Sequence, residues 1–323
     1  MLYPLKFKPI FKEPIWGGED ILPFKGLPAD TRKIGESWEL SHVDQNLSVV
    51  ANGELTGKTI DVLIKEYGAR LLGAKVIEKS GDTFPLLIKF IDARDDLSIQ
   101  VHPNDQLAQE RHRSWGKTEM WYVVKATPDA SLYSGFSKQI TADEYVRRME
   151  EDTLMEALQK YHVEAGDVFF LPAGRVHAIG SGCFIAEIQQ TSNITYRIYD
   201  YNRRDKDGNP REMHTELSKD AIDYTYSADY KTNYQTIENE AVSLVECQYF
   251  TTNLLKLNQP KQRDYASLNS FVVYICTEGE AVVKDDKGHT LTIQQGETIL
   301  FPAETQNVMI EPLQPTTFLE TYF

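Results

Sequence analysis

The sequence predicts a mainly β protein, made of two related β units with short helical insertions. Three observations support this prediction. The 323-residue chain contains 17 tyrosines and 14 phenylalanines, which are enriched in strands. Short apolar runs separated by glycine- and proline-containing turns extend over most of its length. Finally, residues 165–173 (AGDVFFLPA) resemble residues 295–303 (QGETILFPA), since each has a glycine, an acidic residue, four strand residues and Pro-Ala.

The repeat extends upstream of these two nonapeptides. Residues 122–124 (YVV) match residues 273–275 (VYI), and a helical stretch in the first copy takes the place of a short DDKG turn in the second. A chance match of one nonapeptide is the alternative explanation, and the second match weakens it. We therefore expect a first unit over residues 1–240 and a second, smaller unit over residues 241–323.

The charge and the cysteines restrict the class of protein. The formal net charge of −14 argues against a general nucleic-acid binder and against docking on anionic lipid. The sequence has no uncharged apolar run of about 18 residues, so no transmembrane helix is predicted. The N-terminus lacks the apolar core of a signal peptide, and the three cysteines show no paired spacing. We therefore expect a cytoplasmic protein with reduced cysteines.

The first half of the chain is predicted to begin with short strands, followed by a helical insertion at about 58–79. There four residues share one helical face: Ile60, Leu63, Ile64 and Tyr67. The dense apolar run 84–92 predicts a buried strand. Apolar and polar residues then alternate over 97–102, which places Ser98, Gln100 and His102 on one face. A polar face of this kind often lines a cavity.

A second helical insertion is expected at 141–160, where Thr141 is a capping candidate with Glu144 three residues later. Strands are predicted on both sides of it, at 119–126, 163–171, 183–189 and 195–201. The charged segment 202–212 is predicted to be a loop, and the polar stretch 215–243 to link the two units. Short strands follow to the end of the chain.

The most specific local motif runs from Gly166 through Pro172 and Gly174 to His177, with the spacing G-x5-P-x-G-x2-H. Glycine permits the turns that L-residues disfavour, and proline ends the strand. This spacing is the second motif of the cupin superfamily, with Ser181 in place of the usual asparagine. The resemblance implies that both units have a cupin-like jelly-roll (double-stranded β-helix) fold, with His177 pointing into the first barrel.

The corresponding first motif of cupins reads Gln100-Val101-His102 here, followed by Glu119. Each of these residues alone would more often be structural, but together with His177 they favour a metal site. Nitrogen and oxygen ligands from separate strands suit zinc or a similar divalent ion, with Gln100 as a candidate fourth ligand. In the second copy, Asn307 aligns with His177 and Ser270 with Glu119. We therefore expect the second unit to be metal-free and structural.

Beyond the superfamily, the chain resembles the type I phosphomannose isomerases in their short bacterial form. The resemblance covers most of the chain and is carried by several sequence blocks: PIWGG (14–18), GESWELS (35–41), FPLLIK (84–89), LSIQVHP (97–103), GKTEMW (116–121), PAGRVHA (172–178) and QTSNITYR (190–197). It implies interconversion of mannose 6-phosphate and fructose 6-phosphate through a cis-enediol. The extra helical domain of the longer relatives is largely missing.

The resemblance also implies site residues. One Zn²⁺ per chain would be held by His102, Glu119 and His177, and Gln100 matches a fourth ligand of longer relatives. Arg197 matches the catalytic arginine of the family. Three residues match positions that line the substrate pocket: Ser98, Lys89 and Lys117.

Two residues compete for the role of catalytic base. Lys117 lies two residues before Glu119, so strand alternation places it on the same side, where it could serve as the base or bind phosphate. Glu187 is the rival, because burial raises the pKa of a carboxyl group. The sequence does not choose between them.

The remaining cations carry structural alternatives. Lys89 and the pair Arg203–Arg204 are further candidates for phosphate binding, although a solvated loop pair is the favoured interpretation of the two arginines. For Arg197, the structural alternative is pairing with Asp200 or Asp205.

Two other functions remain open at this stage. One is a non-catalytic paralogue that binds a metal and a sugar phosphate. The other is a redox cupin with iron or manganese, against which the glutamine at position 100 argues, because such enzymes usually keep both histidines of the first motif. The sequence does not address the oligomeric state.

Overall fold

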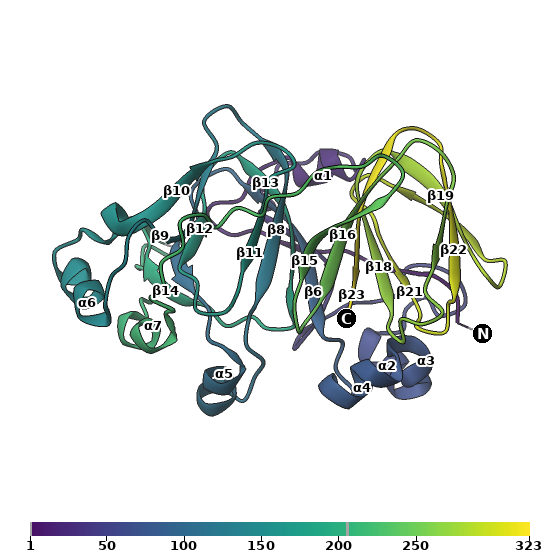
Figure 1. Ribbon diagram of the computed structural model, residues 1–323, viewed down its shortest axis with the longest axis horizontal. Coiled ribbons are helices and arrows are strands. Elements are labelled where there is room, and N and C mark those ends of the chain that lie inside the picture. The colour runs from purple at the N-terminus through teal and green to yellow at the C-terminus, as the bar shows by residue number, and fades with distance from the viewer. Residues whose placement is uncertain (1, 205–206) are drawn as a thin grey trace.

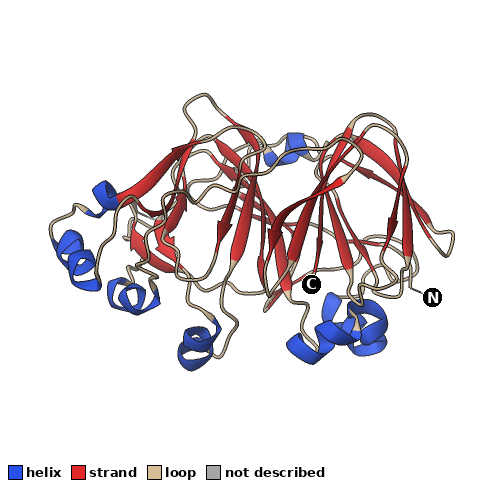
Figure 2. Cartoon of the chain, in the orientation of Figure 1, coloured by secondary structure: helices blue, strands red, loops and turns tan. Residues whose placement is uncertain are grey.

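Two β units lie side by side in the computed structural model, which describes residues 2–204 and 207–323 (Figure 1). Antiparallel sheets form both units, and most helices lie outside the sheets, along the lower side of the molecule in Figure 2. The mainly β fold class predicted from the sequence is therefore confirmed.

Two sheets form the N-terminal unit. The six-stranded sheet has the order β11-β8-β13-β6-β3-β2, with the bounds Val168–Leu171, Glu119–Ala126, Cys183–Gln190, Leu86–Ala93, Glu36–Leu40 and Ile10–Lys12. The five-stranded sheet has the order β10-β9-β12-β7-β14, with the bounds Leu158–His162, Ser131–Phe136, His177–Ile179, Ile99–Val101 and Tyr196–Tyr199. Apolar side chains from both sheets meet in one buried cluster, among them Ile91, Val123, Ile185, Leu132 and Ile179.

The second unit repeats this arrangement. Its six-stranded sheet has the order β1-β21-β18-β23-β16-β15, with the bounds Leu5–Lys6, Thr298–Phe301, Val272–Glu278, Thr316–Tyr322, Thr251–Leu257 and Ala241–Glu246. Its four-stranded sheet has the order β17-β22-β19-β20, with the bounds Lys261–Asp264, Asn307–Pro312, Glu280–Asp285 and Thr290–Gln294. Strand β1 thus crosses from the N-terminus to the second unit, where it pairs with β21. The division of the chain after residue 240 stays a prediction.

The predicted strands are present with shifted ends. The run 84–92 corresponds to β6, in which all eight residues are buried, and 119–126 coincides with β8. The segment 163–171 is a strand only from Val168, because the chain turns at Gly166, which has a φ of 94°. A small two-stranded sheet of β4 (His42–Val43) and β5 (Asn46–Leu47) completes the first 60 residues.

The helical insertion predicted at 58–79 consists of three short helices, α2 (Ile60–Tyr67), α3 (Ala69–Leu72) and α4 (Ala74–Ser80). Gly68 and Gly73 interrupt it with φ angles of 50° and 96°, which L-residues rarely adopt. The predicted apolar face is confirmed, because Ile60, Leu63 and Ile64 are buried. These helices lie at the end of the second unit (Figure 1).

The helix predicted at 141–160 is too long. Helix α6 (Ala142–Glu150) begins as expected, and the hydroxyl of Thr141 accepts from the amide of Glu144 at 3.2 Å. The chain then turns at Asp152, where φ is 55°, into the 3₁₀ helix η1 (Leu154–Ala157). Strand β10 follows, because pairing with β9 outweighs the helical period of the local sequence.

Three further helices complete the structure. Helices α1 (Ile21–Phe24) and α5 (Asp105–His112) lie in the N-terminal half, and α7 (Thr215–Ala221) interrupts the stretch predicted as a link. None of the described helices is long and apolar enough to cross a bilayer.

The strand register revises one residue match of the internal repeat. Strand β11 pairs with β8 so that Val168 faces Tyr122, and β21 pairs with β18 so that Thr298 faces Ile275. The equivalent of Glu119 is therefore Val272 rather than Ser270, because the sequence match between YVV and VYI is displaced by two residues. Among the residues that the structure describes, the one candidate metal cluster lies in the N-terminal unit.

A buried carboxyl group anchors the N-terminal loop to β6. The side chain of Asp92 accepts from the amide of Asp20 at 2.8 Å. Burial raises the pKa of Asp92 to about 6 from its ordinary value of 3.8; the Asp20 amide opposes this shift, and the charges of Asp20 and Glu19 add to it. The native state therefore keeps a proton that the unfolded chain releases first, so the contribution of this group to stability falls as the pH rises from about 4 to about 6.

The substitution Asp92→Asn, which keeps an acceptor but cannot ionise, is expected to stabilise the fold at pH 7.5 by about 1–3 kcal/mol and to have little effect at pH 4. Urea unfolding at both pH values measures this difference. Asp95→Asn, at an exposed neighbouring position, is the control. An equal effect of Asp92→Asn at both pH values would contradict the assignment.

Candidate metal centre and adjoining cavity

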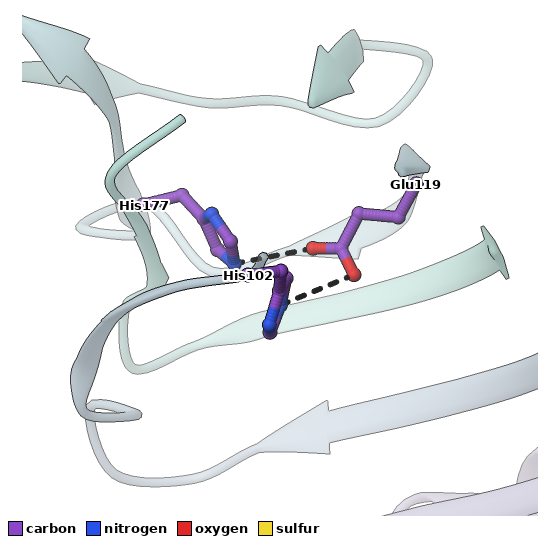
Figure 3. A group of neighbouring side chains, drawn as sticks. All are labelled: His102, Glu119 and His177. Atoms are coloured by element: carbon purple, nitrogen blue, oxygen red, sulfur yellow. Dashed lines mark ion pairs between the residues drawn. The ribbon is translucent and has the colours of Figure 1, made fainter. Parts of the chain in front are cut away.

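Three side chains from separate strands converge inside the N-terminal unit (Figure 3). His102 directly follows β7, Glu119 begins β8 and His177 begins β12. Each is at most 1% exposed, and one ligand atom of each lies within 4.8 Å of the others. Both imidazole rings turn an edge toward the Glu119 carboxylate. The structure thus brings together three of the four candidate ligands named from the sequence.

Backbone carbonyl groups determine the orientation of the two imidazoles. His102 Nδ1 lies 2.9 Å from the carbonyl oxygen of Ile194, and His177 Nδ1 lies 2.8 Å from that of Arg175. Because a carbonyl oxygen only accepts, each Nδ1 carries the hydrogen and donates it. In a neutral ring, Nε2 then keeps its lone pair, and this atom faces Glu119 at 3.5 Å in His102 and 3.2 Å in His177.

The local environment favours neutral rings. Burial and, to a lesser extent, the nearby Lys117 ammonium lower the pKa of His177 to about 3. Burial and the same ammonium hold the pKa of His102 well below its usual range. Two imidazole lone pairs therefore face a carboxylate, an arrangement that a cation between them would stabilise. Glu119 Oε1, a buried atom without a hydrogen-bond partner, faces the same point. This donor set fits a divalent metal ion.

Lys117 lies against two of the three candidate ligands. Its ammonium forms an ion pair with Glu119 Oε2 and lies 2.8 Å from His102 Nε2. Burial raises the pKa of Glu119 to about 7, and the Lys117 charge opposes this rise. Lys117 also lines the adjoining cavity, so it separates the ligand cluster from the space in which a small molecule would lie.

Gln100, the candidate fourth ligand, lies beside His177. Its Nε2 is 3.3 Å from His177 Nε2 and donates to the lone pair of that ring. Rotation of the amide by half a turn would present the side-chain oxygen at the same point. The role of Gln100 as a ligand stays a prediction.

A cavity of about 200 Å³ adjoins the cluster. The residues predicted to line a substrate pocket or to act in catalysis all contribute to its wall. They are Ser98, Lys89, Lys117, Arg197 and Glu187, and Gln100 lies beside them. The wall also contains apolar side chains, among them Trp16, Ile91, Leu97 and Ile179. A pocket lined by both charged or polar and apolar side chains suits a small, charged and hydroxyl-rich molecule.

Glu187 is an ionised partner of Lys89. Its Oε1 lies 3.0 Å from Lys89 Nζ, and its Oε2 accepts from Trp121 Nε1 at 2.8 Å. Burial opposes ionisation of Glu187, but the charges of Lys89 and Lys117 outweigh it and lower the pKa to about 2. The expectation of a raised pKa for this carboxyl group is therefore wrong, because the two ammonium groups outweigh the effect of burial. Burial likewise opposes the charge of Lys89, yet Glu187 and Glu36 raise its pKa.

Arg197 faces the cavity with an unused donor. Its Nη1 donates to the carbonyl oxygen of Glu212 at 2.8 Å, whereas its buried Nε has no partner. The structural alternative for Arg197 is an ion pair with Asp200. It does not apply, because the Asp200 carboxylate is bound by Arg203 and Arg211. Asp205, the other partner considered, lies outside the described residues.

The pair Arg203–Arg204 does not line the cavity. Arg203 is partly buried, binds Asp200 Oδ1 at 2.6 Å and lies over the ring of Tyr201, so it is structural rather than a solvated loop residue. Arg204 is exposed and donates to the carbonyl oxygen of Gly208 at 2.8 Å.

Sequence reasoning missed several residues of the cavity wall. Arg211 lies in the segment predicted only as a charged loop, and its local sequence carries no periodic signal. The others lie within the sequence blocks that carry the family resemblance, and this position is the signal that could have identified them: Trp16, Glu36, Asn193 and Thr195.

A larger cavity lies elsewhere, and none of the candidate ligands lines it. Its volume is about 590 Å³, and its wall includes His42, His112 and Trp115. His42 Nδ1 accepts from the amide of Phe84 at 2.8 Å, and His112 Nε2 lies 2.8 Å from the Tyr196 hydroxyl. These histidines therefore have partners within the protein. The smaller cavity is the candidate site, because it adjoins the ligand cluster.

Family comparisons agree with this geometry. The family model "Phosphomannose isomerase type I, catalytic domain" matches residues 5–119, and "Mannose-6-phosphate isomerase, cupin domain" matches residues 240–312. The mannose-6-phosphate isomerase ManA of Bacillus subtilis is 36% identical over 302 residues, which are 93% of each chain. The mannose-6-phosphate isomerase of Streptococcus mutans is 35% identical over 78% of each chain. The crystal structure of the Bacillus subtilis mannose 6-phosphate isomerase covers 99% of both chains with a TM-score of 0.89 at 29% identity.

Proposed function

The chain belongs to the type I phosphomannose isomerase family, and we propose that it interconverts mannose 6-phosphate and fructose 6-phosphate with one Zn²⁺ per chain. The observation that carries this proposal is the buried His102–Glu119–His177 cluster at the wall of a cavity lined by Lys89, Lys117 and Arg197. The cluster suits a metal ion, and the cations suit an anionic substrate although the whole chain has a net charge of −14.

Zinc is the metal that we propose for these ligands. Two imidazole nitrogens and one carboxylate leave a coordination position open in the four-coordinate geometry that zinc prefers. When bound, the metal supplies Lewis-acid stabilisation to oxygens that become negatively charged. Gln100 is the candidate for a fourth protein ligand.

The chain's own residues supply the proton transfer. Isomerisation of an aldose to a ketose moves a proton between C1 and C2 through a cis-enediol. Of the two candidate bases, Lys117 is favoured, because its side chain lies at the boundary between cluster and cavity; as the neutral amine it would take the proton from one carbon and, as the ammonium so formed, return it to the other. Glu187 is disfavoured, since a carboxylate with a pKa of about 2 is a weak base.

The remaining cations bind and orient the substrate in this proposal. The free Nε of Arg197 is directed to the oxygens that carry charge in the enediol, where a fixed donor is most effective. Lys89 and Ser98 contribute to the pocket wall and orient the sugar phosphate. We place the reaction in the cytoplasm, in keeping with three unpaired cysteines.

A coupled assay of fructose 6-phosphate formation from mannose 6-phosphate, with and without a chelator, tests the proposal. We expect activity that is lost on chelation and restored by Zn²⁺. Metal analysis of the purified protein that found iron or manganese would favour a redox cupin instead. Bound zinc without turnover would support the non-catalytic paralogue.

Arg197→Ala is expected to lower kcat by about 10²–10³-fold, the usual loss for one donor at a developing negative charge. Zinc content should be unchanged, because Arg197 contacts none of the three ligands. Steady-state kinetics and metal analysis of the same preparation measure both quantities. Arg203→Ala, which removes a nearby guanidinium outside the cavity wall, serves as the control. Unchanged kcat in Arg197→Ala would remove this residue from the mechanism.

A further inference from the structure

A hydrogen-bonded chain connects the second unit to the segment that carries Lys117 and Glu119. Tyr249, in the turn between β15 and β16, donates its hydroxyl to Asp105 Oδ2 at 2.7 Å. Asp105 Oδ1 accepts from the amide of Gly116 at 2.8 Å and from Gln190 Nε2 at 3.0 Å. Gln190 Oε1 in turn accepts from the amide of Thr118 at 2.8 Å. This series of hydrogen bonds therefore ends at Thr118, the residue between Lys117 and Glu119.

The segment 116–118 depends on these side chains because it precedes the strand ladder. Strand β8 begins at Glu119, so the amides of Gly116 and Thr118 take side-chain acceptors. Backbone bonds add to this, since the amide of Lys117 donates to Pro103 and the Thr118 carbonyl accepts from Gln190. Gly116 packs so closely that an added Cβ would lie 2.6 Å from the amide nitrogen of Asp105. Small movements of Asp105 are therefore transmitted to this segment.

We propose that Tyr249, Asp105 and Gln190 are positioning residues, through which the second unit determines the placement of Lys117 and Glu119. The inference rests on the proposed function for its catalytic consequence, whereas the positioning itself is a property of the metal-free chain. It also gives the second unit, in which the described residues form no metal cluster, a role at the site.

The hydrogen bond from the Tyr249 hydroxyl is the one whose loss we expect to release the Asp105 carboxylate. Asp105 borders a cavity of about 270 Å³ whose wall also includes Trp115, Gln190 and Tyr249. Without the hydroxyl, Oδ2 loses its protein donor and faces this cavity, so the carboxylate gains freedom to rotate away from Gly116 and Gln190. The benzene ring of a phenylalanine at this position keeps the packing, which separates the hydrogen bond from the volume of the side chain.

Two measurements on Tyr249→Phe test the proposal. In the metal-free protein, we expect amide exchange in peptides that contain residues 116–119 to become about 3- to 10-fold faster, because local opening is easier. Binding of Co²⁺, followed by its visible absorption, should weaken by a similar factor. Gln190→Leu, which removes the direct contact with the amide of Thr118, should weaken Co²⁺ binding by about 10-fold, the lower end of the loss for direct partners of metal ligands, because Thr118 is the neighbour of Glu119.

The matched control is Tyr265→Phe. This substitution likewise removes one hydroxyl from a tyrosine of the second unit; Tyr265 is buried, whereas Tyr249 is partly buried, and its hydroxyl contacts Glu320 rather than Asp105. It should leave exchange at 116–119 and Co²⁺ binding unchanged even if it lowers the melting temperature.

Unchanged exchange in Tyr249→Phe, or an equal effect in Tyr265→Phe, would overturn the proposal. Failure of the unsubstituted protein to bind Co²⁺ would instead contradict the proposed function, and the exchange data would still decide the positioning.

Discussion

Replacement of His177 by alanine is expected to abolish stoichiometric zinc binding and to reduce isomerase activity by at least about 10³-fold, since a catalytic metal supplies several kcal/mol of transition-state stabilisation. The physical reason is the small number of ligands. His177 Nε2 lies 3.2 Å from Glu119 Oε1, and within the part of the chain that the structure describes this cluster consists of two histidines and one glutamate, each with one ligand atom within 4.8 Å of the others. Loss of one imidazole leaves two donors, too few for a tight zinc site.

Metal analysis after gel filtration and the coupled isomerase assay measure the two effects. His214→Ala is the matched control, because His214 donates no atom to the cluster and accepts from the amide of Arg197 at 3.1 Å. That variant should keep its zinc. A His177→Ala protein with full zinc content and full activity would remove the cluster from the proposed function.

Replacement of Lys117 by methionine is expected to lower kcat by about 10²–10⁴-fold, the usual contribution of a positioned proton carrier. Methionine keeps an unbranched side chain but cannot carry a proton. The Lys117 ammonium contacts Glu119 and His102, so its removal also takes a cation in direct contact with these ligands from the metal-free protein. We therefore expect the metal-free variant to be less stable and zinc to raise its melting temperature more than in the unsubstituted protein.

Glu187→Gln provides the comparison that distinguishes the two candidate bases. This change leaves Lys89 with Glu36 as its remaining carboxylate, 3.7 Å away, so the main expected loss is in stability. We expect kcat to fall by about 10-fold or less, far less than in Lys117→Met. The reverse order of the two effects on kcat would identify Glu187 as the base, despite its low pKa. Zinc analysis of both variants excludes loss of metal as the cause.

The two units keep a buried glutamate at equivalent places and use it differently. In β13, Glu187 faces Lys89 on one neighbouring strand and Trp121 on the other. In β23, Glu320 faces Asn253 and Tyr274 in the same pattern. Arg263 binds both oxygens of Glu320 at 2.8 Å. A bidentate pair of this kind satisfies the carboxylate internally, in agreement with a structural role for the second unit.

Local sequence identified most strands and the three ligands because their signals are short-range. The dense apolar run 84–92 predicts β6, in which all eight residues are buried. The glycine and proline spacing around His177 is a motif of backbone turns. Helix ends were less predictable. Leu158 fits the helical period of the preceding residues, but it lies in β10 because β9 offers backbone partners from a distant part of the chain.

The sequence by itself therefore determined the mainly β class, the family and the cluster of His102, Glu119 and His177. The tertiary structure decided which charges meet. It paired Glu187 with Lys89, which lowers the pKa of this glutamate, and it brought Arg211 to the cavity. It also joined Tyr249 to the ligand-bearing segment. The physical reason is that a pKa and a hydrogen bond depend on neighbours across strands, which are far apart in the sequence.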